Sequence, residues 1–444
     1  MRVEHKRGIA SLSSMSSATA GASADLAHTS RRAIVAACVG NAAEWYDFAI
    51  YGSLATVIGL VFFPTQDLAT ALSAAFATYG TAFLVRPLGA LLFGRLGDAH
   101  GRRTVLVRVV FLMAGATTCV ALLPGYATIG LLAPVVLVLL RAAQGLAAGG
   151  ELGVAAVFIL ENAHHARRGQ TAAWHTATMA IGIGTGMAVG GVLSYLFSET
   201  GLDSGWWRIA FLLALPLGFI GVQLRRRVAE TPQFEALRTD SRLADHPARE
   251  LWTYHRPAVL RGFCLIAAGS LAFNTFFIFM PNNLISRRGG ELGPVLMVTA
   301  SALGVAAIAA VALGRLSDHV GRRPVVIGST AALLILPWPM SLVALRGSLV
   351  SLFVAEALVG VAVAGVLSVA MLGELFAVPV RSTGFALTAG LATALIGGTA
   401  PLVAQLLVTL VDLEAAPGIY VAVMAGLALI ALRSWPETAF RALI

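Results

Sequence analysis

Long apolar runs constrain this chain more than any other feature. Stretches of about 20 or more mainly apolar residues follow one another from residue 34 to residue 433, with short polar segments between them. A run of this length crosses the hydrocarbon core of a bilayer as an α-helix. Because lipid offers no hydrogen-bond partners, each run must satisfy its backbone within its own helix. The sequence therefore predicts an all-α integral membrane protein.

Composition agrees with this class. Only 12% of the 444 residues are charged, whereas soluble domains have about 25%, and the mean hydropathy is +0.82. The runs predict twelve transmembrane helices, with boundaries uncertain by several residues. Their approximate limits are 34–62, 69–95, 104–123, 128–157, 171–197, 206–224, 260–284, 293–315, 324–344, 350–373, 384–410 and 416–433.

The formal net charge of +9 is distributed unevenly. If the N-terminus is cytoplasmic, most arginines fall in segments on the cytoplasmic side, and the predicted outer segments hold only Arg287, Arg288 and Arg346. This is the positive-inside asymmetry of membrane proteins. We interpret the basic charge as orientation and contact with anionic lipid, and expect no nucleic-acid partner. Both termini are expected in the cytoplasm.

An internal repeat divides the chain. GRLGDAHGRR at 94–103 returns as GRLSDHVGRR at 314–323, with seven of ten positions identical. The copies follow the second and eighth expected helices, which predicts two pseudo-symmetric six-helix bundles. Such halves with a site at their interface are typical of transporters. The expected parts are a disordered cytoplasmic tail 1–33, bundles 34–224 and 260–433, a cytoplasmic central loop 225–259 and a short cytoplasmic tail 434–444.

The first apolar run carries polar side chains at membrane depth. Its segment GNAAEWYDFAIYG, residues 40–52, includes two acids one turn apart. Acids in mid-membrane are costly and mark functional sites by default. Four polar side chains fall within an arc of about 120° on a helix of 3.6 residues per turn, so they should face the bundle interior. They are Asn41, Glu44, Asp47 and Tyr51.

The fourth expected helix supplies a cation at similar depth. Arg141 shares its face with Gln144 and Glu151. A buried carboxylate needs a cation, so we expect Asp47 to pair with Arg141. The pair either couples transport to protons, because an acid that loses its cation takes up a proton, or is a static contact. Glu44 is either a second proton acceptor or a hydrogen-bonded scaffold residue.

Further candidates for the substrate site are spread over the chain. Arg86 either attracts an anionic substrate or pairs with Glu151. His175, beside Trp174, either sets substrate choice or is a hydrogen-bonded interior histidine. The second half has no Lys or Arg at mid-helix depth, only amides and hydroxyls such as Asn274, and Thr399 in IGGTAP stands where a helix break is expected. Glu356 is expected to reach water near the outer end of its helix.

Several stretches together resemble one family. They are EWYDFAIYG, FLVRPLGALLFGRLGD, RAAQGLAAGGELG, LRRRVAETPQF, ELFAVPVRSTGFA and IGGTAPLVA, in this order. The chain is similar to the metabolite:proton symporters of the major facilitator superfamily. The resemblance implies proton-coupled uptake of a small organic acid or a zwitterion. In related proton-coupled sugar carriers, a first-helix acid and a fourth-helix arginine couple transport to protons, and Asp47 and Arg141 match them.

The resemblance also assigns a role to the repeated segment. In this superfamily, its acid is thought to cap a neighbouring helix and hold one conformational state, with nearby arginines assisting. The alternative is that the arginines only set topology. The matching residues are Asp98, Arg102, Arg103, Asp318, Arg322 and Arg323.

The function expected from the sequence is secondary active transport. We expect proton-coupled uptake of a small carboxylate by alternating access. Uptake of a zwitterion, export of a metabolite and a non-transporting sensor remain alternatives. The short segment after the last expected helix argues against the osmosensing proline/betaine subtype. No pattern typical of catalysis, a metal site or a cofactor is present, so we expect no enzyme. The expected partners are solute, protons and lipid, and the protein is expected to be a monomer in a bacterial inner membrane.

Overall fold

The computed structural model describes residues 34–65, 67–100, 102–151, 154–197, 205–225, 251–253, 255–345, 348–411 and 413–441, and all regular elements in these ranges are helical. Within these ranges, seven helices are long and apolar enough to cross a membrane, and counting each of two bent helix pairs as one span gives nine. Shorter apolar helices occupy the third, sixth and twelfth expected positions. The all-α prediction is confirmed, and every expected span coincides with a helix.

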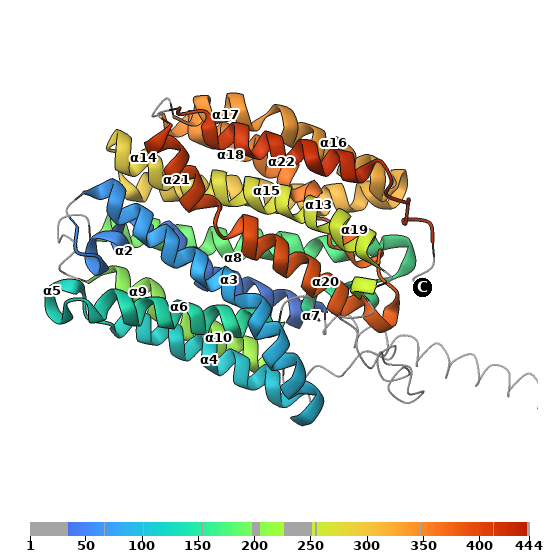
Figure 1. Cartoon of the computed structure of the whole chain (residues 1–444), viewed down its shortest axis with the longest axis horizontal. Coiled ribbons are helices and arrows are strands. Elements are labelled where there is room, and N and C mark those ends of the chain that lie inside the picture. The colour runs from blue at the N-terminus through green and yellow to red at the C-terminus, as the bar shows by residue number, and fades with distance from the viewer. Residues whose placement is uncertain are drawn as a thin grey trace, which may run out of the picture.

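The first half of the chain forms one group of helices, drawn from blue to green in Figure 1. The described elements are the helix Ile34–Ser53, α2 (Ala55–Phe62), α3 (Leu68–His100), α4 (Arg102–Leu122), α5 (Tyr126–Ile129), α6 (Leu132–Glu151), α7 (Val154–Glu161), the 3₁₀ turn η1 (His165–Arg167), α8 (Arg168–Leu196), α9 (Trp207–Leu212) and α10 (Ala214–Arg225).

The second half forms the other group, drawn from yellow to red (Figure 1). Its described elements are α13 (Arg256–Asn274), the π-helix η3 (Thr275–Phe279), α14 (Met280–Arg288), α15 (Leu292–Val320), α16 (Arg322–Ile335), α17 (Pro337–Ala344), α18 (Leu349–Val366), α19 (Val369–Gly373), α20 (Val378–Ala392), the π-helix η4 (Thr393–Gly397), α21 (Ala400–Leu410) and α22 (Ala416–Leu432). The expected N-terminal tail, most of the central loop and residues 442–444 lie outside the described residues.

The halves meet along two seams. Helix α8 packs on α15, and α3 packs on α20, η4 and α21 (Figure 1). Small residues allow the close approach, since a Cβ built on Gly191 would lie 3.0 Å from the Gly293 carbonyl oxygen. At the other end of α8, a Cβ on Gly314 would lie 2.7 Å from the carbonyl oxygen of Gly169. Glycines let membrane helices pack closely, so the α8–α15 seam is tight at both ends.

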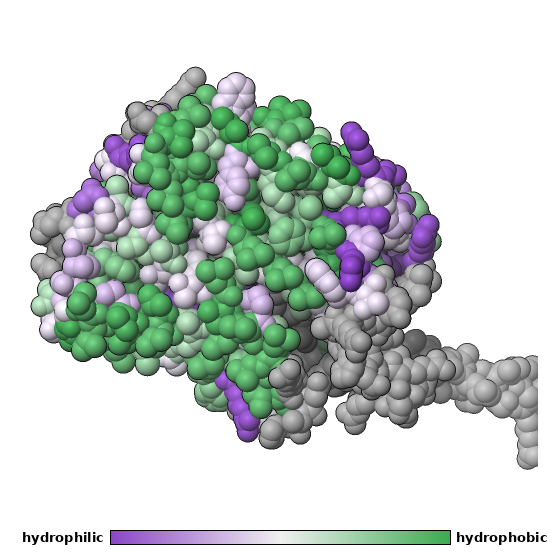
Figure 2. All heavy atoms as spheres, in the orientation of Figure 1, coloured by the Kyte–Doolittle hydropathy of each residue, from purple (hydrophilic) through white to green (hydrophobic). Residues whose placement is uncertain are grey.

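The exterior suits a bilayer. Figure 2 shows hydrophobic residues over the middle of the visible face and hydrophilic ones toward its ends. Large apolar side chains are strongly exposed, among them Leu139 (63%), Ile308 (74%) and Val350 (72%). Exposed apolar surface of this extent is rare on soluble monomers. We call the end of the bundle that carries Arg168, Arg322, Arg323, Arg381 and Arg433 the arginine-rich end; it is the end that the sequence places in the cytoplasm.

Two expected loops are helical. The repeated segment was expected to follow its helices, but α3 runs to His100 and α15 to Val320. The second copy leaves the helix only at Gly321, whose φ of +102° is strained for any residue with a Cβ. Asp318 therefore lies in the last turn of α15, and the helix fixes the position of its side chain.

The first membrane-spanning helix is bent by 62° between Ile34–Ser53 and Ala55–Phe62. No proline causes this bend. Instead, the Asn282 amide nitrogen donates to the Gly52 carbonyl at 2.9 Å, and its oxygen accepts from the Thr56 hydroxyl at 3.0 Å and backbone N–H at 3.4 Å. A helix in lipid can bend where a neighbouring side chain satisfies the freed backbone groups. Asn282 thus joins the two halves at the end opposite the arginines.

We predict that Asn282→Leu lowers stability by about 1–3 kcal/mol, because it leaves buried polar groups without partners. Asn283→Leu is the matched control, since Asn283 is equally buried but its amide nitrogen has no hydrogen-bond partner. Thermal unfolding in detergent measures both. Equal midpoints for the two variants would show that the bend does not depend on Asn282.

Candidate substrate and proton site

Asp47 and Arg141 both lie inside the first half, but they do not form the expected ion pair. The Arg141 Nη1 donates to the Gln144 Oε1 at 2.8 Å, and the Gln144 Nε2 donates to the Thr117 Oγ1 at 2.8 Å. The Thr117 hydroxyl lies 3.1 Å from the Asp47 Oδ2. The expectation of a direct contact is wrong because Thr117 of α4 stands between them. Instead, a chain of hydrogen bonds through Thr117 and Gln144, which we call the relay, connects Asp47 to Arg141.

The relay has one movable proton. The Thr117 hydroxyl also lies 2.9 Å from the Met113 carbonyl oxygen. A hydroxyl has a single proton to donate, so it serves either Asp47 or Met113 at one time. The Asp47 Oδ1 has no hydrogen-bond partner. Among the described residues, the Asp47 carboxylate therefore depends on a single hydrogen-bond donor, the Thr117 hydroxyl, which can turn away to Met113.

Arg141 is held mainly by aromatic rings. Its guanidinium carbon lies 4.3 Å from the centre of the Tyr51 ring, 5.2 Å from that of Phe48 and 5.7 Å from that of Tyr79. Cations at these distances are attracted by ring faces. Its Nε and Nη2 have no hydrogen-bond partner, and the side chain is 1% exposed.

Arg86 is a second buried guanidinium beside the first. Its guanidinium carbon lies 4.3 Å from the centres of the Phe48 and Phe83 rings and 5.4 Å from that of Trp45. None of its three guanidinium nitrogens has a hydrogen-bond partner, and it is 0% exposed. The pairing with Glu151 considered from the sequence is not made. Glu44 is the acid that interacts electrostatically with Arg86.

Both guanidinium groups share the Phe48 ring, so they lie close together. Five of their nitrogens are buried without hydrogen-bond partners. We call Arg86, Arg141 and the rings of Phe48, Tyr51 and Tyr79 the arginine–aromatic cluster. Buried charged donors without acceptors are costly, so this cluster suits an anion.

Among the described residues, one hydrogen bond joins the second half to the cluster. The Tyr79 hydroxyl donates to the Asn274 Oδ1 at 3.0 Å, and the Asn274 Nδ2 donates to the Ser270 carbonyl at 2.9 Å. Asn274 immediately precedes the π-helix η3. π-Helical turns in membrane and soluble helices are frequent at functional sites. Of the substrate candidates, Tyr51, Arg86, Gln144 and Asn274 therefore gather here.

Four other candidates lie elsewhere. Asn41 donates to the His175 carbonyl at 2.9 Å and to the Thr178 hydroxyl at 3.0 Å, so it fastens the first helix to α8. The His175 ring makes no hydrogen bond to another described residue, and Trp174 is 44% exposed. The Thr399 hydroxyl donates to the Leu395 carbonyl at 2.8 Å. The expected interruption near Thr399 is present as η4 followed by a new α-helix at Ala400.

Glu356 does not reach water. The expectation is wrong because α18 turns this side chain inward against α15, where it is 0% exposed. The Thr299 hydroxyl donates to its Oε1 at 2.9 Å, and its Oε2 has no hydrogen-bond partner. The sequence showed an acid near a helix end but not which face of that helix is buried.

One of the cavities between the halves is small. A cavity of about 10 Å³ lies among residues such as Thr176, Phe277 and Gly360, which is room for about one water. The described contacts between halves occur at both ends of the bundle. A substrate would therefore need a rearrangement of the halves before it could reach the arginine–aromatic cluster.

The arginine-rich end is closed by the second copy of the repeat. Asp318 accepts from the backbone N–H of Gly169 at 2.8 Å and of Gln170 at 2.9 Å, so it caps the N-terminus of α8 from the other half. Arg322 binds Asp318 at 2.7 Å, and Arg323 donates to the Arg433 carbonyl. The side chains of Asp98, Arg102 and Arg103 lie outside the described residues.

Further ion pairs lie at this end. Arg168 contacts Glu374 at 3.3 Å and Arg381 contacts Glu161 at 3.0 Å, and both pairs join the halves. Within the second half, Arg322 contacts Glu374 at 3.6 Å. We call Asp318, Arg322, Glu374 and Arg168 the closing network. Three of these four residues are nearly inaccessible, which separates them from ordinary surface pairs, whose contribution is small.

The segment after α22 adds a strap across this network. Glu437 accepts from the backbone N–H of Arg322 at 2.9 Å and of Arg323 at 3.0 Å, which caps α16. The Arg441 carbonyl accepts from Arg168 at 3.0 Å. The expected short tail is thus folded onto both halves. Burial opposes ionisation, but four backbone N–H groups outweigh it and hold the pKa of Glu437 below its usual value.

Several residues of the site were not expected from the sequence. Thr117 and Tyr79 are polar residues within apolar helices, and Glu374 and Glu437 lie outside the repeat. The only signal in the sequence that could have drawn attention to Thr117 and Tyr79 is that they are polar residues within transmembrane helices. Among the described residues, no group of three or more His, Cys, Asp or Glu side chains could hold a metal ion.

Fold and site together are those of a membrane transporter. The sequence matches the family described as "Sugar (and other) transporter" over residues 33–246 and 235–444. The chain belongs to this family of the major facilitator superfamily and, within it, to the metabolite:proton symporters. It is a multi-pass transporter and not an enzyme.

Curated relatives cover nearly the whole chain. The proline/betaine transporter of Salmonella typhimurium is 35% identical over 93% of this chain and 85% of its own length. The alpha-ketoglutarate permease of Escherichia coli is 34% identical over 93% and 96%. The citrate-proton symporter of Klebsiella pneumoniae is 32% identical over 90% of each.

Solved structures share the fold. The proton:xylose symporter XylE, bound to 6-bromo-6-deoxy-D-glucose, has a TM-score of 0.73 at 16% identity, covering 94% of this chain and 98% of that one. A partially occluded, inward-open structure of XylE from E. coli has a TM-score of 0.70 at 18% identity over 94% and 100%. The prediction of two six-helix bundles with the major facilitator fold is confirmed.

We predict that Thr117→Val lowers stability by about 1–3 kcal/mol, because the isosteric side chain leaves Asp47 and Gln144 without their shared partner. Thr117→Ser keeps the hydroxyl and should unfold close to wild type. The midpoint of thermal unfolding in detergent distinguishes them. If Val and Ser behave alike, the relay contributes nothing to stability.

We predict a pH-dependent contribution of the strap. A glutamate in the unfolded chain titrates near pH ~4.3, and the pKa of Glu437 in the folded protein is lower. Its stabilisation, about 1 kcal/mol for a helix cap, is therefore complete at neutral pH and is lost as pH falls through the folded value. The unfolding midpoints of wild type and Glu437→Gln should differ at pH 7 and converge once the pH falls below the folded pKa of Glu437. A constant difference down to the lowest measurable pH would contradict this.

Proposed function

We propose that the protein imports a small organic acid together with protons across a bacterial cytoplasmic membrane. The five buried guanidinium nitrogens of Arg86 and Arg141 that lack hydrogen-bond partners carry this proposal. A carboxylate that enters between the halves would provide acceptors for these donors. Charge-assisted bonds between guanidinium and carboxylate are strong and often bidentate.

The surroundings of the cluster support the same substrate class. In the described part of the second half, the polar groups buried near mid-helix are amides and hydroxyls, such as Asn274, Thr388 and Gln405, apart from the carboxyl of Glu356. The positive charge for a carboxylate therefore comes from the first half. Amides of the second half, with Asn274 already bonded to Tyr79, would recognise the remainder of the solute.

Coupling to protons follows from the relay. A substrate carboxylate that engages Arg141 would draw its Nη1 from Gln144. Gln144 and Thr117 would then reorient, and the Thr117 hydroxyl would donate to Met113. Asp47, which has no other described donor, would be left as a carboxylate in an apolar interior and would take up a proton. Substrate and proton would thus be bound together.

The closing network gives the cycle its second state. In the proposal, Asp318 and its partners hold the arginine-rich end shut while solute and proton arrive from the opposite end. Transit requires these ion pairs to separate. The Asn282 contact at the other end, which is present in this structure, would open to admit the solute and form again afterwards. Alternating access of this kind is a rocking of one half against the other around a fixed site.

A zwitterion is the second candidate. Ammonium groups bind aromatic faces, and the cluster holds three rings beside its arginines. The named relatives include a proline/betaine transporter as well as carboxylate carriers. The carboxylate remains our first choice because the ring faces are already occupied by the two guanidinium groups.

The test is uptake by purified protein in proteoliposomes with an imposed pH gradient. We expect accumulation of one or more small di- or tricarboxylates and no effect of excess betaine or proline. Asp47→Asn should abolish accumulation but retain counterflow, since asparagine cannot cycle a proton. Arg86→Gln should raise the KM about 10- to 100-fold, the loss of a hydrogen bond to a charged group.

Arg287→Gln serves as the matched control. It removes an arginine of α14, which lies near the end of the bundle opposite the arginine-rich end. Accumulation driven by the pH gradient in Asp47→Asn would remove the coupling role from Asp47. If the protein takes up betaine and carboxylates do not inhibit that uptake, the proposed substrate class is overturned.

A further inference from the structure

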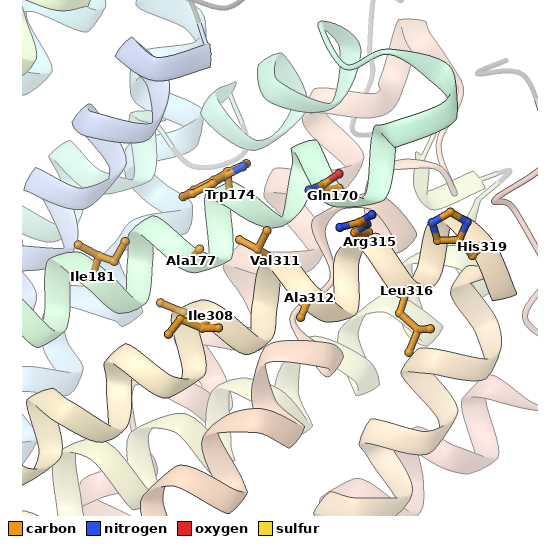
Figure 3. Close-up of a pocket in the computed structure, with 11 residues that line it drawn as sticks. Gln170, Trp174, Ala177, Ile181, Ile308, Val311, Ala312, Arg315, Leu316 and His319 are labelled. Carbon is orange, nitrogen blue, oxygen red and sulfur yellow. The ribbon is translucent and has the colours of Figure 1, made fainter.

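A groove runs along the outer side of the α8–α15 seam. It encloses about 690 Å³ and lies away from the arginine–aromatic cluster. Its walls over most of its length are apolar, with Ala177 and Ile181 from α8 and Ile308 and Val311 from α15 (Figure 3). Ile181 is 45% exposed and Ile308 is 74% exposed. In a membrane-spanning bundle, apolar residues this exposed face lipid chains, so the groove opens toward the bilayer.

One end of the groove is polar. Gln170, Arg315 and His319 line it next to the arginine-rich end (Figure 3). Among the described residues, no side-chain hydrogen bond or ion pair involves Arg315 or His319. The nearby acid Asp318 is already engaged by Arg322 and by the backbone of α8. The polar end therefore presents the positive charge of Arg315, which no described residue neutralises.

We propose that this groove is a binding site for an anionic phospholipid of the leaflet at the arginine-rich end. An acyl chain would lie along the apolar walls. The phosphate would accept from Arg315 and from a ring N–H of His319, with the Gln170 amide as a further donor. A guanidinium matches phosphate geometry through two parallel N–H groups. Trp174, between the polar and apolar parts (Figure 3), suits the headgroup boundary, where tryptophan is enriched.

Charge complementarity selects the anionic class. The cytoplasmic leaflet is rich in anionic lipids, which attract basic residues near the membrane surface. A neutral lipid would fill the apolar part equally well but would leave Arg315 and His319 without an acceptor. A water-soluble solute would have little reason to enter a groove whose walls are mostly apolar and open to lipid.

The site joins the two halves of the protein. One wall belongs to α8 and the other to α15, and Gln170 donates its backbone N–H to Asp318 in the closing network. A bound lipid would bridge the helices beside that cap and would favour the closed arginine-rich end. This consequence for transport rests on the proposed function, whereas binding of the lipid does not.

Native mass spectrometry of the purified, delipidated full chain tests the binding. Phosphatidylglycerol and phosphatidylcholine with identical chains are titrated separately. We expect tighter retention of phosphatidylglycerol, and a loss of about fivefold in its affinity for each of Arg315→Gln and His319→Gln, the size expected for one basic contact near a membrane surface. Arg433→Gln is the matched control, because Arg433 is an exposed arginine at the same end and does not line the groove.

A second variant separates the groove from general surface charge. Ala312→Trp fills the exposed wall of the groove and leaves all charges in place. It should reduce retention of both lipids, while Arg315→Gln reduces only that of phosphatidylglycerol. Unchanged phosphatidylglycerol binding in Arg315→Gln and Ala312→Trp would overturn the site. Equal affinities of wild type for the two lipids would overturn the anionic assignment.

Transport provides a separate readout. Proteoliposomes with and without phosphatidylglycerol should differ in turnover for wild type and Arg433→Gln, and not for the double variant Arg315→Gln, His319→Gln. A wild type that binds the lipid but shows no transport in any membrane would contradict the proposed function and leave the lipid site intact.

Discussion

The burial of two guanidinium groups inside an apolar bundle is the condition on which the interior depends. Arg86 and Arg141 are almost fully inaccessible, and an unpaired charge in low dielectric is expensive. The bundle reduces this cost with ring faces rather than with direct carboxylate contacts, because Phe48, Tyr51, Tyr79 and Phe83 surround the two groups. Aromatic faces stabilise a cation without consuming its hydrogen-bond donors, which leaves the donors available to a ligand.

The same condition explains the relay. A direct Asp47–Arg141 pair would neutralise both groups and would have to be broken in every cycle, and breaking a buried pair costs about 3–5 kcal/mol. With Thr117 and Gln144 interposed, the two charges communicate through hydrogen bonds that can be exchanged one at a time. The site is thereby poised between two arrangements, which suits a carrier better than a fixed ion pair.

The two ends of the bundle are built differently. At the arginine-rich end, charged side chains close the seam, and the caps on α8 and α16 come from residues distant in sequence, Asp318 and Glu437. At the opposite end, the contact is neutral, with Asn282 bonded to the backbone at a helix bend. The kind of contact follows the polarity of its surroundings. Ion pairs form near water, and hydrogen bonds from a neutral amide form within the apolar region. The groove proposed to bind lipid lies beside the charged end, where the repeat places Arg315.

The sequence alone determined the class, the order of the helical runs and the internal repeat, because in lipid every apolar run of sufficient length must become a helix. It also selected Asp47, Arg86 and Arg141, since charges within such runs are few. It did not determine how these side chains meet. The position of Thr117 between acid and base, the inward face of Glu356 and the strap through Glu437 depend on helix rotation and on contacts between residues up to hundreds of positions apart. Those follow from packing the two halves together, which the periodicity of one helix does not encode.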